Sequence, residues 1–127
     1  MFAVALVTQP TVRAAEPALL GAWNGAHISA ELTALGGTVE FDCARGAIDK
    51  PVVPDQSGRF DVTGRYFEER GGPVRADAPE DEGMAVRYQG TVKADRMQLT
   101  VTRGDGGVRI GAFTLVRGAE PTLVKCR

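Results

Sequence analysis

The sequence contains few of the residues from which most metal and nucleophile sites are built. One histidine and two cysteines occur in 127 residues. Two thiols and one imidazole cannot complete a four-ligand zinc site without help from carboxylates. Ser29 and Ser57 are the only serines, and neither lies in the G-x-S-x-G turn of a serine hydrolase. We therefore expect no metal site, no cofactor and no catalytic residues, and a protein that is not an enzyme.

Long apolar runs and charge of one sign are also missing. No apolar stretch approaches the roughly 20 residues of a membrane-spanning helix, so we expect no membrane span. The 15 basic and 16 acidic residues are interspersed and give a net charge of -1. Because no basic stripe is present to follow a phosphate backbone, we expect no nucleic-acid partner.

Glycine, by contrast, is abundant, with 16 residues. Seven or eight short apolar runs are each closed by a turn, and most of these turns carry glycine, for example at 36–37, 55–58, 71–73 and 104–107. Apolar and polar residues alternate between the turns, and no segment has helical periodicity. The pattern predicts an all-β protein, an antiparallel up-and-down meander that closes into a small barrel of seven or eight strands.

The alternation predicts a series of strands with two irregularities. We expect a bulge near residues 24–25 that turns Trp23 inward, and another near Gly111 where the parity slips. Between residues 44 and 54 the pattern weakens to a short extended piece. The expected strands are 20–33, 38–43, 59–69, 85–93, 96–102 and 108–117, with a last piece at 122–126.

The first 15 residues differ from the rest and predict export. Residues 2–7 are apolar, and Val12 and Ala14 have the small-residue spacing of a signal-peptidase site. No basic residue separates Met1 from the apolar stretch, so one explanation is a true start upstream of Met1. Residues 1–15 are thus a signal-peptide remnant or a disordered tail, and 16–127 form a single barrel domain in the periplasm or outside the cell.

The two cysteines, Cys43 and Cys126, lie far apart in the chain. In an exported domain a disulfide bond between them is the economical interpretation. It would hold the last piece of chain and contribute about 4 kcal/mol in the chain-entropy model. The alternative is two unrelated buried thiols that act as small apolar side chains. Strand parity places Cys43 near the core.

Five aromatic side chains share the predicted inward parity, that of Trp23 depending on the bulge. We expect them to line a ligand cavity or simply to fill the core, since a barrel of about eight strands has room for at most one small ligand. Gly64 and Gly90 also point inward, where they would either open space or let facing rings pack. The predicted ligand-binding set is Trp23, Phe41, Phe60, Tyr66 and Tyr88, with Arg117 as the polar orienting group.

Gly21-Ala22-Trp23 at the start of the first strand resembles the G-x-W signature of calycin-type barrels, the superfamily of lipocalins, fatty-acid-binding proteins and avidins. The resemblance implies that the tryptophan closes one barrel end and packs against an arginine of the last strand. Arg117 is the matching candidate. It further implies a small apolar ligand inside the barrel.

The segment Phe41-Asp42-Cys43-Ala44-Arg45-Gly46, together with residues 58–64 and 123–126, resembles a group of small exported bacterial proteins of unassigned activity. That resemblance implies export and agrees with the disulfide. These proteins often carry histidine where this chain has Arg45, which argues against a metal or catalytic role at that position.

Taken together, these features predict an exported, monomeric, non-enzymatic binding module for a small apolar molecule. The alternative is a protein-interaction or inhibitor domain of the cell envelope that uses the loop 71–83, because long loops on rigid scaffolds often carry function.

Overall fold

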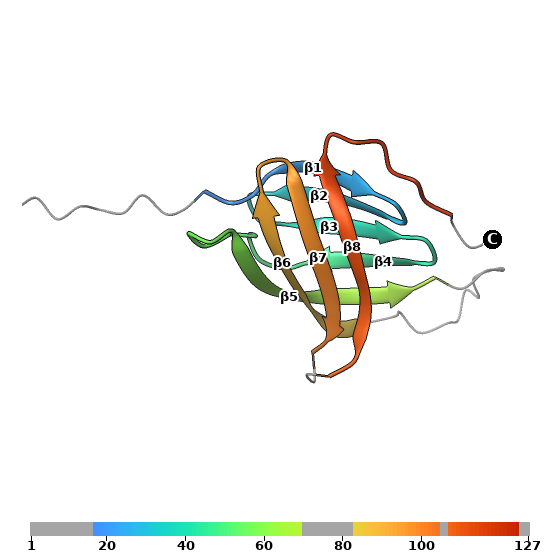
Figure 1. Cartoon of the computed structure of the whole chain (residues 1–127). Coiled ribbons are helices and arrows are strands. Elements are labelled where there is room, and N and C mark those ends of the chain that lie inside the picture. Colours follow the sequence, from blue (N-terminus) through green and yellow to red (C-terminus); the bar gives the residue numbers. More distant parts are fainter. Residues whose placement is uncertain (1–16, 70–82, 105–106, 125–127) are drawn as a thin grey trace, which may run out of the picture.

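The computed structural model describes residues 17–69, 83–104 and 107–124. Its eight strands are all antiparallel, and each pairs with the next in chain order until β8 pairs with β1 (Figure 1). The described residues contain no helix long and apolar enough to cross a membrane. The predicted all-β meander and its closure are confirmed. The strands are β1 (Gly21–Gly25), β2 (Ile28–Thr33), β3 (Gly36–Phe41), β4 (Ala44–Ile48), β5 (Arg59–Glu68), β6 (Met84–Lys93), β7 (Arg96–Arg103) and β8 (Arg109–Arg117).

The prediction of one strand over 20–33 is wrong, because the chain folds back within it. β1 and β2 form a tight hairpin whose turn contains His27 at a φ of 68°. A positive φ is uncommon for a residue other than glycine, so the turn carries no recognisable signal in the sequence. The parity conflict between Trp23 and Ile28 came from this turn rather than from a bulge.

A second difference lies at β4, where the alternation is hidden. Its inward positions Ala44 and Gly46 are small, so the strand lacks the apolar pattern that marks its neighbours. β3 ends at Phe41, and Cys43 lies in the turn that leads to β4. Cys43 is exposed there, so the prediction that it lies near the core is wrong.

β3 begins and ends two residues before the predicted bounds 38–43, and the later strands agree closely with prediction. β5, β6 and β7 each begin and end within a residue of the predicted bounds. Val101 pairs with Gly111 while Thr102 pairs with Arg109, so Ile110 is the extra residue of a bulge in β8. This irregularity confirms the bulge predicted near Gly111. The predicted hairpin turn at 105–106 lies outside the described residues.

The core is the interior of the barrel. Figure 1 shows β6, β7 and β8 crossing steeply over β1–β5, so their inward side chains meet near the middle. Tyr88, Leu115 and Val101 of these strands are fully buried, as are Trp23 and Ile28 of the facing hairpin. No buried side-chain polar atom of the described residues lacks a hydrogen-bond partner.

Candidate functional site

Trp23 and Arg117 meet at one end of the barrel, where β1 pairs with β8. The guanidinium of Arg117 lies 4.6 Å from the centre of the fully buried Trp23 ring, a cation–π contact. Both side chains donate a hydrogen bond to the carbonyl of Leu20, Trp23 at 3.3 Å and Arg117 at 3.4 Å. The contact expected from the calycin resemblance is present. Arg117 covers the ring and is thereby held at the rim of the barrel.

Phe41 and Tyr66 lie together in a second group of rings. The Phe41 ring is 5.3 Å from that of Tyr66 and 5.4 Å from that of Phe113, distances at which tilted aromatic rings attract. Burial, and then the charge of Glu68, raise the pKa of Tyr66 above its usual 10.0. Phe41 is buried, whereas Tyr66 and Phe113 are half-buried.

Tyr88 crosses the interior and fills its middle. Its hydroxyl donates a 2.7 Å hydrogen bond to the carbonyl of Arg65. A Cβ at Gly46 would overlap this hydroxyl, and one at Gly64 would lie 2.7 Å from Tyr88 Cε2. The two glycines therefore provide the space that the tyrosine ring occupies. Burial raises the pKa of Tyr88 strongly, with smaller contributions from the charges of Tyr66 and Asp49, so its hydroxyl stays protonated.

Phe60 fills space in the same way. A Cβ at Gly90 would lie 2.6 Å from Phe60 Cζ, so the glycine makes room for the ring of the neighbouring strand. Beside Phe60 an internal cavity of only about 10 Å³ is left, which is at most the space of one water molecule. The predicted set thus divides into two barrel ends and a filled middle. Among the described residues, the space left beside Phe60 is too small for an apolar ligand.

His27 and Ser29 are not arranged as parts of a catalytic triad. His27 Nδ1 lies 2.6 Å from Asp42 Oδ2, and the imidazole is 60% exposed. Ser29 instead donates a 2.6 Å hydrogen bond to Asn24 Oδ1. The histidine sits in a turn with its carboxylate partner, and the serine belongs to a separate structural contact.

The C-terminal segment lies against β1 and the turn after β3. Asn24 Nδ2 donates to the carbonyl of Ala119 at 2.7 Å, and His27 N donates to that of Thr122 at 2.7 Å. The amide of Val124 then donates to Asp42 Oδ1 at 2.8 Å. Asp42 precedes Cys43, and Val124 stands two positions before Cys126. Cys126 lies outside the described residues, so the disulfide stays a prediction, which this hydrogen bond supports.

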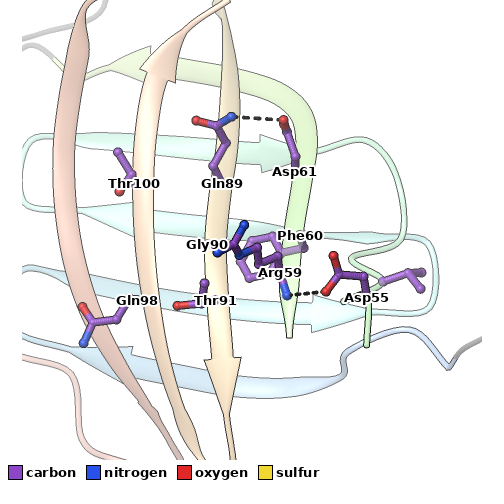
Figure 2. Close-up of a pocket in the computed structure, with 10 residues that line it drawn as sticks. Asp55, Arg59, Phe60, Asp61, Gln89, Gly90, Thr91, Gln98 and Thr100 are labelled. Atoms are coloured by element: carbon purple, nitrogen blue, oxygen red, sulfur yellow. Dashed lines mark hydrogen bonds between the residues drawn. The ribbon is translucent and has the colours of Figure 1, made fainter. Parts of the chain in front are cut away.

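A groove that the sequence had not indicated lies on the outer face of β5, β6 and β7 (Figure 2). It is an open hollow of about 630 Å³. Outward positions of the three strands supply most of its polar side chains, and the link before β5 adds the rest. The lining residues are Val53, Asp55, Arg59, Phe60, Asp61, Gln89, Gly90, Thr91, Gln98 and Thr100.

The two carboxylates of the groove are held in fixed positions. Asp61 accepts a 3.1 Å hydrogen bond from Arg87 Nε and one of 3.0 Å from Gln89 Nε2, and Arg87 Nη2 forms an ion pair with it (Figure 2 shows the Gln89 contact). Burial tends to raise the pKa of Asp61, but the hydrogen bonds of Gln89 and Arg87 and the charge of Arg87 together lower it. Asp55 Oδ1 accepts from the backbone amides of Ser57 at 2.8 Å and Arg59 at 3.0 Å.

Other groups in the groove retain hydrogen-bonding capacity. Gln98 accepts a 3.0 Å hydrogen bond from Thr114 through Oε1, which leaves its amide NH₂ for other partners. Within the described part of the chain, the hydroxyls of Thr91 and Thr100 and the guanidinium of Arg59 have no side-chain hydrogen bond. The groove thus combines fixed charges with free donors and acceptors.

Comparisons of the chain with protein families, with curated proteins and with solved structures found no match. The candidate site therefore depends on this chain's own geometry. The loop 71–83, the predicted interaction loop, lies outside the described residues apart from Gly83. The sequence holds only a partial signal for the groove, since the outward positions 98, 100 and 102 are glutamine and threonine rather than charged residues.

Proposed function

We propose that the protein is an exported, non-enzymatic binding module that holds its ligand outside the barrel, in the groove over β5, β6 and β7. One observation carries the proposal. The cavity beside Phe60 has a volume of about 10 Å³, whereas the groove measures about 630 Å³. Ligand sites in proteins are typically about 300–1,000 Å³. The ligand class predicted from sequence, a small apolar molecule in the interior, is replaced in this proposal by a ligand on the outer face.

The chemistry of the groove supports binding rather than catalysis. A general acid works best with a pKa near the operating pH, and the pKa of Asp61 is lowered instead. Its oxygens are already engaged by Arg87 and Gln89. Such a carboxylate remains ionised and fixed, which suits an element that positions a ligand.

Export accords with the contacts around Cys43. Cys43 is exposed, which argues against the alternative of a thiol buried as a small apolar side chain. The Asp42–Val124 hydrogen bond brings the two cysteine-bearing segments together. A disulfide between Cys43 and Cys126 would persist in an oxidising compartment such as the periplasm or the extracellular space.

Amide chemical-shift mapping tests the site with probes of three different chemistries: cellotetraose, decanoate and tetra-alanine. Each would be titrated into the intact chain. We expect at least one of them to shift the amides of Gln89, Thr91 and Thr100, and none to shift those of the buried residues Ile28 and Val39 on β2 and β3. Shifts confined to the interior, or no shifts in the groove with any probe, would contradict the proposal.

A matched pair of variants controls this experiment. Thr100→Tyr places a ring in the groove and should abolish the shifts. Thr63→Tyr makes the same change at an exposed position of β5 that does not line the groove, and should leave them unchanged.

A further inference from the structure

We infer that the groove binds a neutral, hydroxyl-rich ligand, the chemistry of an oligosaccharide segment. This inference rests on the proposed function, because it names the ligand class of the same groove. It follows from the balance of charge, from the kind of free hydrogen-bonding groups, from the groove's apolar lining and from the pairing of its strands.

The charged side chains in and beside the groove are balanced in sign, and both carboxylates already form hydrogen bonds. Asp55 and Asp61 are matched by Arg59 and by Arg87, which forms the ion pair with Asp61. Asp55 Oδ1 takes two backbone amides, and both oxygens of Asp61 accept hydrogen bonds. A metal ion or a cationic ligand would have to compete with Arg87 and Gln89 for Asp61. Among the lining residues that the structure describes, a polyanion would find only the guanidinium of Arg59. An uncharged ligand leaves the contacts of Asp55 and Asp61 intact.

The groups left available are those that recognise hydroxyls. Thr91 and Thr100 each offer a hydroxyl that both donates and accepts, and Gln98 offers amide donors. Gln89 donates through Nε2 to Asp61, which leaves its Oε1 as an acceptor. These groups come from neighbouring strands, which lie about 4.8 Å apart. Such an array matches a ligand that carries donor–acceptor groups along its length.

The groove also has an apolar component. Val53 is partly exposed and lines it, together with Phe60 of β5 and Gly90 of β6. A sugar ring has hydroxyls at its edge and an apolar face of C–H groups. A mixed lining of this kind can contact both parts at once.

Strand pairing disfavours an extended peptide at this place. Peptides that bind to sheets usually add to a free edge through backbone hydrogen bonds. β6 is paired to β5 over residues 84–91 and to β7 over residues 86–93, so both of its edges are occupied at the groove positions 89–91. Recognition must therefore come from side chains alone, which suits a saccharide better than a peptide.

The test is isothermal calorimetry on the intact chain with a series of tetrasaccharides. Neutral probes are cellotetraose, maltotetraose and N-acetylchitotetraose; charged probes are tetragalacturonate and de-acetylated chitotetraose. We expect at least one neutral probe to bind and the charged probes not to bind. Because the ligand carries no charge, its affinity should not fall when the salt concentration is raised.

Variants tie the binding to the groove. Thr91→Ala and Gln98→Ala each remove one neutral hydrogen bond, so each should weaken the affinity about threefold to tenfold. Thr63→Ala, a threonine of the same outer sheet outside the lining, should leave it unchanged. Thermal melting of each variant checks that the fold is intact.

The outcomes separate the two proposals. If no neutral probe binds while a charged sugar or tetra-alanine shifts the groove amides, the inferred ligand class is wrong and the groove remains a binding site. If no probe of any class acts on the groove, both proposals fail. Binding that is unaffected by Thr91→Ala and Gln98→Ala would also overturn the inference.

Discussion

The inner and outer faces of β5, β6 and β7 are built from alternate residues of the same strands, yet they differ in packing and in polarity. On the inner face, the Tyr88 and Phe60 rings occupy the space that glycines leave, and a cavity of about 10 Å³ remains. The outer face has an open groove of about 630 Å³ with free hydroxyls and amides. Alternation thus assigns the filled core to one set of residues and the proposed binding groove to the other. Substitutions inside should change stability, and substitutions of the unpaired polar groups outside, such as Thr91 and Gln98, should change binding.

Tyr88→Ala would break the inner face most severely. Removing a buried ring from a close-packed core costs about 3–5 kcal/mol, since transfer energy is lost and a cavity forms. Urea unfolding would measure this loss. Tyr88→Phe, which removes only the hydrogen bond to Arg65, should cost about 1 kcal/mol. A loss below about 1 kcal/mol for Tyr88→Ala would show that the ring does not support the interior.

Substitution of Cys43, in the turn between β3 and β4, tests the predicted disulfide bond. If Cys43 is bridged to Cys126, Cys43→Ser should lower the free energy of unfolding by up to about 4 kcal/mol and should leave groove binding unchanged. Urea unfolding with and without a reducing agent would measure the effect, which reduction should reproduce in the wild type. Mass spectrometry that finds two free thiols in native protein would contradict the bridge.

Gly46→Ala tests whether the interior has room for one more methyl group beside Tyr88. The added methyl would overlap the Tyr88 hydroxyl, and overpacking of this kind costs about 1–3 kcal/mol. In a Tyr88→Phe background the nearest remaining atoms lie 3.2 Å away, so the cost should be smaller. A double-mutant cycle of unfolding free energies measures this coupling. Strict additivity would show that the hydroxyl is not the obstacle.

Asp61→Asn should produce the smallest change, and a change that depends on pH. The folded-state pKa of Asp61 is lowered from 3.8, so its stabilising contribution is present above that value and is lost as the pH falls through the folded pKa. The difference in unfolding free energy between wild type and Asp61→Asn should therefore shrink below about pH 4. Urea unfolding at a series of pH values measures it. A difference that grows on acidification would contradict the assigned contacts.

The barrel could be predicted from the sequence because its signals are local. Alternation located β5, β6 and β7 to within a residue, and the parity slip located the bulge at Ile110. The hairpin turn at His27 escaped prediction because its positive φ falls on a residue other than glycine. β4 was not predicted because its inward position 46 is a glycine rather than an apolar residue. The glycine leaves room for the hydroxyl of Tyr88, which lies far along the chain.

The candidate site was harder to predict, for a related reason. Inward parity identified the buried rings of Phe41, Phe60 and Tyr88, whereas Tyr66 is half-buried and Trp23 was turned inward by a bulge that is absent. The Trp23–Arg117 contact was expected. The inward or outward parity of a residue does not show whether the aromatic rings enclose a cavity or fill the interior. That depends on which glycine lies opposite which ring, as Gly90 does for Phe60. The groove depends in turn on the register of three strands and on the link that carries Asp55. No local pattern records that combination.

Trp23 emission during titration with a fluorescent fatty acid tests the central claim, a solid interior, most directly. Trp23 is fully buried and belongs to the cluster of core side chains, so a ligand inside the barrel would alter its fluorescence. The account predicts neither quenching nor a spectral shift at micromolar ligand. Saturable quenching of Trp23 would show that the barrel opens to an apolar guest, and would contradict the account.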